Sequence, residues 1–166
     1  ILMSSSLRIY TSQDVTGVEL GGALKNIIGL GAGIADVMEA GDNGKSAFIT
    51  RGLAEITRLG IAAGAQALTF AGLAGLGDLI ATCNIRLSRN RYVGEQLARG
   101  RTWPEIQMSM DNVTEGVNAT RAALEMAARL DVEMPIAQVT YRVLFEGLSP
   151  HEAAAELMGR PARSEW

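Results

Sequence analysis

The sequence predicts an all-α fold in which several helices surround one core. Apolar residues recur at intervals of three and four along most of the 166 residues. Capping patterns, glycines and prolines divide the chain into segments of helical length. Strand-like alternation is confined to residues 7–10, which favour one short strand near the N-terminus. A chain of this length is sufficient for one domain with a hydrophobic core.

Two long helices are expected in the N-terminal half. Ser12 or Asp14 can cap the start of the first helix. The Asp-Asn-Gly segment 42–44 is typical of a turn, so it predicts where the second helix begins. In that second helix the spacing places Glu55 with two arginines on a face separate from the apolar one. The Gly-rich segment 71–79 predicts a short helix, a turn and a new helix start.

Clear start and stop signals mark the helices of the C-terminal half. Ser88 is a predicted N-cap for a helix over residues 89–98, which Gly100 would close. Capping boxes at residues 102–105 and 149–152 predict two more helix starts. Further helices are expected over residues 118–130 and from Pro135 to a stop at Gly147.

Composition excludes several classes of partner and site. The net charge of −3 gives no general attraction for nucleic acid or anionic membranes. No apolar run approaches the length of a membrane span, and no signal peptide is visible. Cys83 is the only cysteine and His151 the only histidine. We therefore expect no disulfide within the chain, a buried Cys83, no metal site and a cytoplasmic location.

The first predicted helix carries a row of glycines with one lysine at its middle. Gly17, Gly21, Lys25, Gly29 and Gly33 follow one another at four-residue steps, which places them on one helix face. Each glycine costs up to about 1 kcal/mol relative to alanine inside a helix. The row therefore predicts that another backbone, or a ligand, comes close to this face.

Lys25 is the first candidate for chemistry, because it would stand in a narrow apolar groove. Desolvation there would disfavour the charged ammonium form, which suits a group that exchanges protons. The alternative is that Lys25 extends to solvent and the glycines serve only tight helix packing.

Asp78 is the second candidate, since it is the only charged residue between Arg58 and Arg86. Its carboxylate could pair with Lys25 or accept a hydrogen bond from a substrate hydroxyl. The alternative is a plain helix N-cap. Thr82, one turn later, would project from the same helix face.

Residues 86–91 are the candidate anion site. Ser88, Arg89 and Asn90 open a helix, where free N–H groups and the helix dipole attract phosphate. The arginine adds a planar donor pair suited to phosphate oxygens. An exposed basic helix start without a ligand is the alternative.

Six segments together resemble the C-terminal domain of NAD(P)-dependent glycerol-3-phosphate dehydrogenases. They are GVELGGALKN (17–26), ITRGLAE (49–55), GLAGLGDL (72–79), SRNR (88–91), EGVNAT (115–120) and VEMPI (132–136). The resemblance implies the helical fold of the 6-phosphogluconate-dehydrogenase C-terminal-domain-like type. It also implies that residues 14–166 form the substrate-binding domain. Residues 1–13 would then be a strand and linker left from a preceding Rossmann domain.

The resemblance also implies roles for individual residues. Lys25 would be the general acid/base and Asp78 would orient it. Substrate contacts would come from Lys25, Asp78, Ser88, Arg89 and Asn90, with Asn26 and Thr82 as further neighbours. The cofactor, NAD or NADP, would be bound mainly by the preceding domain, with contacts from Arg89, Val113 and Glu115.

The implied reaction interconverts dihydroxyacetone phosphate and glycerol 3-phosphate for glycerophospholipid synthesis, and the chain by itself would be inactive. A homodimer is a further possibility. Two alternatives stay open. One is the C-terminal domain of a related two-domain dehydrogenase acting on another small hydroxy or keto acid. The other is a non-enzymatic helical module whose glycine row serves helix or dimer contact.

Overall fold

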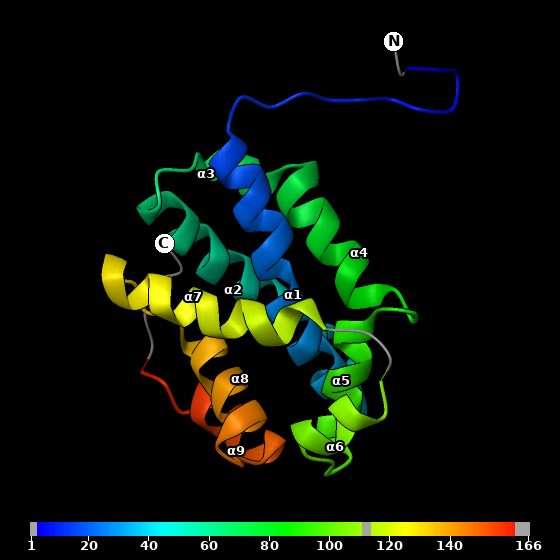
Figure 1. Ribbon diagram of the computed structural model, residues 1–166, viewed down its shortest axis with the longest axis vertical. Helices are drawn as coiled ribbons and strands as arrows, with labels where there is room; N and C mark the ends of the chain where they lie inside the picture. Colours follow the sequence, from blue (N-terminus) through cyan, green and yellow to red (C-terminus); the bar gives the residue numbers. More distant parts are fainter. Residues whose placement is uncertain (1–2, 111–113, 162–166) are drawn as a thin grey trace.

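The computed structural model describes residues 3–110 and 114–161, and within them the fold is all-α, as predicted (Figure 1). The elements, in chain order, are α1 (Val15–Val37), α2 (Gly41–Ala62), α3 (Ala67–Ala71), the π-helical turn η1 (Leu73–Gly77), α4 (Asp78–Asn84), α5 (Arg89–Ala98), α6 (Trp103–Met108), α7 (Glu115–Leu130), α8 (Pro135–Phe145) and α9 (Pro150–Met158).

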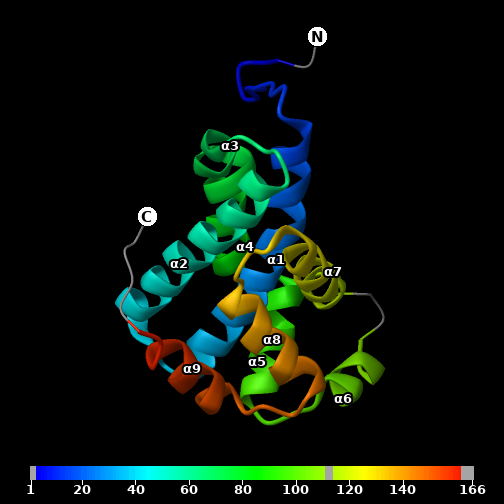
Figure 2. The same ribbon diagram turned by 90° about the vertical axis from the view of Figure 1, so that its left-hand side faces the viewer.

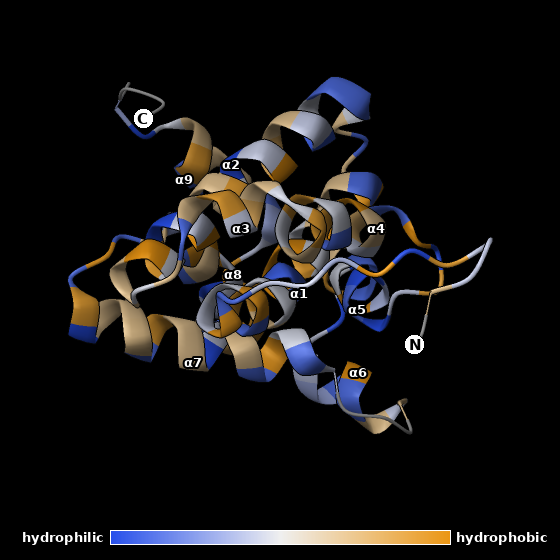
Figure 3. Cartoon of the chain, turned by 90° about the horizontal axis from the view of Figure 1, so that it is seen from above, coloured by the Kyte–Doolittle hydropathy of each residue, from blue (hydrophilic) through white to orange (hydrophobic). Residues whose placement is uncertain are grey.

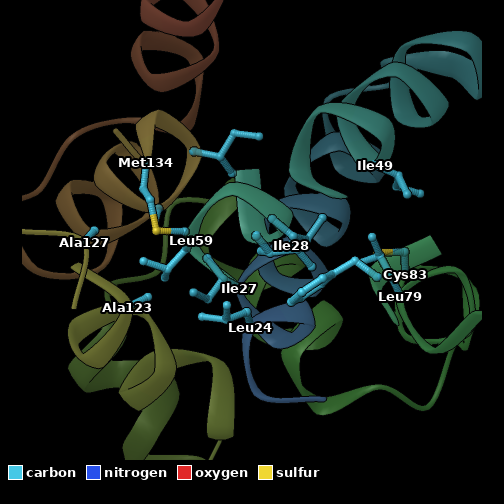
Figure 4. Close-up of a cluster of buried hydrophobic side chains, with 14 of the residues drawn as sticks. Leu24, Ile27, Ile28, Ile49, Leu59, Leu79, Cys83, Ala123, Ala127 and Met134 are labelled. Atoms are coloured by element: carbon cyan, nitrogen blue, oxygen red, sulfur yellow. The ribbon is translucent and has the colours of Figure 1, made fainter. Parts of the chain in front are cut away.

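The long helix α1 lies at the centre and packs against α2, α4, α5 and α7. In both ribbon views α3 lies at one end of the molecule and α6 and α9 lie at the other (Figures 1 and 2). Ile27, Ile28 and Leu30 of α1 are fully buried. Figure 4 shows α1 side chains meeting those of α2, α4, α7 and Met134, which precedes α8. The central position of α1 explains why the faces of this one helix determine the geometry of the site.

Most helix starts follow the predicted capping residues. The Asp14 carboxylate caps α1 by accepting a hydrogen bond from Gly17 N at 2.9 Å. It also accepts from Thr69 Oγ1 at 2.6 Å and Gln66 N at 2.9 Å, which ties α1 to the start of α3. These bonds, that from Thr69 above all, lower the pKa of Asp14. Ser88 caps α5, and both predicted capping boxes form.

Three local predictions are wrong. Residues 7–10 form no strand within the described part of the chain, because no second strand is present there to pair with them. The turn before α2 uses the left-handed residues Glu39 (φ 54°) and Gly41 (φ 70°), so segment 42–44 lies inside the helix. α7 begins at Glu115, three residues before the predicted start at residue 118.

Among the described residues, α1 is long and apolar enough to cross a membrane by length and composition alone. Ten of its residues, however, are buried by the other helices of the same fold. Colouring by hydropathy shows polar and apolar residues alternating along the helices around it (Figure 3). This is the pattern of a core helix in a globular protein.

Candidate active site

Neighbouring segments closely approach the glycine row of α1. A Cβ at Gly21 would lie 2.7 Å from the carbonyl oxygen of Ala74 in η1, and one at Gly29 would lie 3.0 Å from Thr82 Cγ2 in α4. A Cβ at Gly33 would overlap the Arg91 carbonyl of α5. The predicted close approach is therefore confirmed. Segments of the same chain cover this face, so it is not free to contact a second copy.

Lys25 and Asp78 form an ion pair at the middle of this row. Asp78 is the first residue of α4, and its side chain does not cap that helix, whose N-cap is Gly77. The side chains of Lys25 and Asp78 are 19% and 38% exposed, so the pair stands at the edge of solvent rather than in the core. Lys25 thus neither extends freely into water nor lies sealed from a ligand.

A cavity of about 230 Å³ collects most of the predicted substrate residues, although Lys25 and Asp78 themselves do not line it. Asn26 follows Lys25 on α1, and Thr82 lies one turn after Asp78 on α4. The cavity is lined by Asn26, Thr82, Ile85, Leu87, Ser88, Arg89, Asn90 and Glu115. A larger hollow of about 340 Å³ between α7, α8 and α9 contains none of the predicted site residues.

The predicted anion site forms one wall of the cavity, at the start of α5. Ser88 Oγ accepts a hydrogen bond from Arg91 N at 3.3 Å, which is a normal N-cap bond. Arg89 Nη2 lies 2.8 Å from Glu115 Oε1, and both side chains are about half exposed. The guanidinium is therefore accessible to an anion, although Glu115 competes for it. Val113 lies outside the described residues.

Asn90 differs from the other predicted contacts because its side chain amide is already used within the protein. The residue is only 5% exposed. Its Oδ1 accepts from Gly116 N at 2.9 Å, and its Nδ2 donates to Asn26 Oδ1 at 2.8 Å. Asn90 thus joins α5 to α1 and to α7 behind the cavity.

The interactions of two groups of charged residues were not predicted from the sequence. Arg91, next to the anion wall, is turned inward, where its Nε lies 2.6 Å from Asp36 Oδ2. Lys45 also contacts Asp36, and together the two cations hold the pKa of that carboxyl below its usual range despite partial burial. Asp36 is one turn beyond the row in sequence, but its partners come from α2 and α5, so no local pattern indicates the cluster.

The second group is Glu55, which is 1% exposed rather than on a polar face. Its carboxylate accepts from Ile136 N and Ala137 N, each at 2.9 Å, at the start of α8. Burial raises the pKa of Glu55 to about 7, although these hydrogen bonds oppose the shift. Cys83 is buried as predicted, and burial raises its pKa to about 12. Within the described residues, no cluster of His, Cys, Asp or Glu is arranged to hold a metal ion.

Comparison with known proteins matches this arrangement to one family. The model of the NAD-dependent glycerol-3-phosphate dehydrogenase C-terminus matches residues 14–155. The chain is 54% identical over 165 residues to a glycerol-3-phosphate dehydrogenase (NAD(P)+) of Dehalococcoides mccartyi, covering 99% of this chain and 46% of that protein. It is 56% identical over 158 residues to that of Geobacillus thermodenitrificans, covering 95% and 46% respectively.

A solved structure shares both the sequence and the fold. The crystal structure of glycerol-3-phosphate dehydrogenase from Coxiella burnetii is 40% identical, with a TM-score of 0.90 over 96% of this chain and 49% of that one. The chain thus spans about half the length of the relatives that it matches. It belongs to the NAD-dependent glycerol-3-phosphate dehydrogenase C-terminal family.

Proposed function

We propose that this chain is the substrate-binding and proton-transfer half of an enzyme that interconverts dihydroxyacetone phosphate and glycerol 3-phosphate. The observation that carries the proposal is the ion pair of Lys25 and Asp78, whose neighbours on the same helices, Asn26 and Thr82, line a cavity with a cationic wall. Membership of the family supports the choice of substrate.

Lys25 is the proposed general acid/base. An ammonium at the edge of the cavity donates a proton to the ketone oxygen as that oxygen becomes an alkoxide, and the free amine takes the hydroxyl proton in the reverse direction. Asp78 holds the Lys25 side chain in one place, which lowers the entropic cost of the transfer. Asn26 and Thr82, which follow the two partners on α1 and α4 and line the cavity, are proposed as further substrate contacts.

The phosphate of the substrate is proposed to bind at the start of α5. Arg89 offers two parallel donors, and the helix dipole of α5 adds a partial positive charge at Ser88. Asn90 was predicted to bind substrate, and its backbone N–H at the helix start remains compatible with that role. Its side chain amide is bonded to Gly116 N and Asn26 Oδ1.

The cofactor is proposed to be NAD or NADP. When bound, the nicotinamide exchanges a hydride with the ketone carbon of the substrate. The exposed guanidinium of Arg89 and the neighbouring Glu115 fit a phosphate and a ribose hydroxyl in chemical character, and Val113 is proposed with them. Most of the binding would come from a Rossmann domain, to which residues 1–13 connect, while residues 14–166 form the catalytic domain. The chain by itself would then lack turnover.

The cellular setting is part of the proposal. The reaction would provide glycerol 3-phosphate for glycerophospholipid synthesis. A free, buried Cys83 fits a reducing cytoplasm. A homodimer is possible, but its contact would not use the glycine row, because η1, α4 and α5 cover that face.

Replacing Lys25 in the full-length enzyme tests the proposal. Lys25→Ala should lower kcat about 10²- to 10⁴-fold, because the proton donor is lost. The thermal unfolding temperature should change little, since the pair is partly exposed. Lys25→Arg is the matched control: it keeps the charge and the partner Asp78 but is a poor proton donor, so it should be nearly as inactive. Unchanged turnover in Lys25→Ala would refute the catalytic role.

Arg89→Ala separates this substrate from a related hydroxy or keto acid. It should raise KM for dihydroxyacetone phosphate with a smaller effect on kcat, because the phosphate takes no part in the chemistry. A rise confined to the KM of the cofactor would instead assign Arg89 to the dinucleotide alone.

A further inference from the structure

We infer that Asn90 acts through Asn26, and that together they make one wall of the cavity a hydrogen-bond donor that selects a phosphoryl oxygen. The inference rests on the proposed function for the identity of the ligand. Asn90 is then a positioning residue, and Asn26 is the residue that meets the ligand.

The direction of the hydrogen bonds is set by a backbone amide. The N–H of Gly116 can only donate, so the atom of Asn90 that lies 2.9 Å from it must be the oxygen. The Asn90 nitrogen therefore faces Asn26, and donates to its Oδ1 at 2.8 Å. The oxygen of Asn26 is thereby occupied. We call the series Gly116–Asn90–Asn26 the amide relay.

The nitrogen of Asn26 is what remains for the cavity. One N–H of Nδ2 points to the carbonyl oxygen of Gly22 at 3.3 Å, which can only accept and so agrees with the same orientation. The other N–H has no acceptor among the residues that the structure describes. Because Asn26 lines the cavity, its amide can offer a ligand this N–H but not its oxygen; the acceptors that also line the cavity belong to other residues, Thr82, Ser88 and Glu115.

Two glycines make the relay possible. A Cβ at Gly116 would lie 2.6 Å from Asn90 Oδ1 and 2.7 Å from the Asn26 carbonyl oxygen, so only glycine lets this amide reach Asn90. A Cβ at Gly29 would lie 3.4 Å from Asn90 Cβ and 3.0 Å from Thr82 Cγ2. The close packing of α1, α5 and α7 thus serves the orientation of two side chain amides.

The relay and Arg89 favour the same ligand chemistry. A phosphate monoester dianion presents only acceptors, so it matches the Asn26 donor in a cavity that Arg89 also lines. A neutral hydroxyl or amide ligand would gain less from such a wall. Reversing the amide of Asn26 would instead bring an oxygen toward the anion.

Asn90→Asp reverses the relay with little change in shape. An aspartate at position 90 still accepts from Gly116 N, but it cannot donate to Asn26. The Asn26 amide then turns its nitrogen toward the carboxylate and its oxygen toward the cavity. We expect phosphate binding to weaken about 10- to 100-fold, the range for losing a hydrogen bond to a charged group.

The test is an NMR titration of the isotopically labelled chain with inorganic phosphate. In the unmodified chain, phosphate should shift the side chain amide signals of Asn26, and in N90D it should not. N84D is the matched control, because it adds the same charge at an exposed position at the end of α4. The effect of N90D should be much larger than that of N84D, and should fall to the N84D level in an N26A background. Equal effects of N90D and N84D, or no shift of Asn26 in the unmodified chain, would overturn the relay.

N26D tests the same hydrogen bonds by changing the acceptor instead of the donor. It can be used even if N90D is unstable. The new carboxylate still accepts from Asn90, so the Gly116 amide signal should keep its position while phosphate binding is lost. A displaced Gly116 signal would show that the direction of the bonds is wrong. In the full-length enzyme, N90D should raise KM for dihydroxyacetone phosphate and leave KM for the dinucleotide unchanged; the reverse would assign the donor wall to the cofactor.

The outcomes separate the relay from the proposed function. A Lys25→Ala enzyme with full turnover would refute the catalytic proposal, yet the phosphate titration of N90D would still measure the relay. An unaffected N90D would refute the relay while leaving Lys25 as the proton donor.

Discussion

Glu55 and Asp78 are two carboxylates in largely apolar stretches of the sequence, but they differ in exposure, in bonding partners and in role. Glu55 is 1% exposed and accepts from two backbone N–H groups at the start of α8. Asp78 is 38% exposed and pairs with the ammonium of Lys25 beside a cavity. The more deeply buried carboxylate is thus the one without access to a ligand.

Burial alone therefore does not identify a functional carboxylate. Both oxygens of Glu55, on α2, accept hydrogen bonds from backbone N–H groups of α8, so its role is to hold the two helices together. Asp78 pairs with a single side chain, that of Lys25, and is partly open to solvent. Three substitutions and one change of pH test this difference between the two carboxylates.

The largest effect on stability is expected from Glu55→Ala. The change leaves two buried backbone N–H groups without acceptors, which costs about 4 kcal/mol in free energy of unfolding. For a chain of this length that corresponds to a decrease of roughly 10 °C in the unfolding temperature, measured by circular dichroism. Glu125→Ala, at an exposed position of α7, is the control and should change it little. Equal effects of the two substitutions would show that Glu55 does not hold α8.

Stability should also depend on pH through Glu55. The unfolded chain releases this proton near the ordinary glutamate pKa of 4.5, whereas burial in the folded chain raises the pKa to about 7. Between these values the folded state binds more protons, so stability falls as pH rises. The shift corresponds to about 3 kcal/mol at most. Urea unfolding at several pH values measures it, and Glu55→Gln should remove most of the slope. The positive charges of nearby Arg58 and Arg160 oppose the upward shift of the Glu55 pKa.

Asp78→Asn should show the opposite behaviour. Loss of the charge at this partly exposed site should change the free energy of unfolding by less than about 1 kcal/mol. The turnover of the full-length enzyme should fall about 10- to 100-fold, because Lys25 loses the group that positions it. A large loss of stability with intact kcat would instead make Asp78 a structural residue like Glu55.

The smallest effect is expected at a third carboxylate, Asp14. Like Glu55, it accepts hydrogen bonds from two backbone N–H groups, but it lies at the N-terminal end of α1. Thr69→Val removes the hydrogen bond that contributes most to lowering the pKa of Asp14. The titration midpoint of Asp14, followed by NMR, should therefore move upward. No change would mean that the backbone N–H groups of Gln66 and Gly17 alone fix this pKa.

Local signals determined how much of the fold could be predicted. The bounds of α5 follow from Ser88 and Gly100, whose roles depend only on neighbouring residues. The start of α2 was mispredicted because the Asp-Asn-Gly segment 42–44 favours a turn, while the structure places the left-handed residues before it, at positions 39 and 41. The strand predicted at residues 7–10 does not form, because a strand needs a partner strand, which a local pattern cannot predict.

Long-range contacts limited the prediction of the site. The glycine row predicted that something approaches α1, and the family resemblance supplied the roles of Lys25 and Asp78. Neither could indicate that Glu55 meets residues 81 and 82 positions away, or that Arg91 turns inward to Asp36 while Arg89 faces the cavity. These outcomes depend on which helices pack together, which the spacing within one helix does not encode.

The amide relay has a consequence for how this site can change its specificity. Its direction begins at the peptide N–H of Gly116, a group that every amino acid except proline carries. No substitution with another N–H-bearing residue can reverse that donor, and larger residues at position 116 would clash with Asn90 and α1. A descendant of this protein that accepts a neutral substrate would therefore have to change Asn26 or Asn90 themselves.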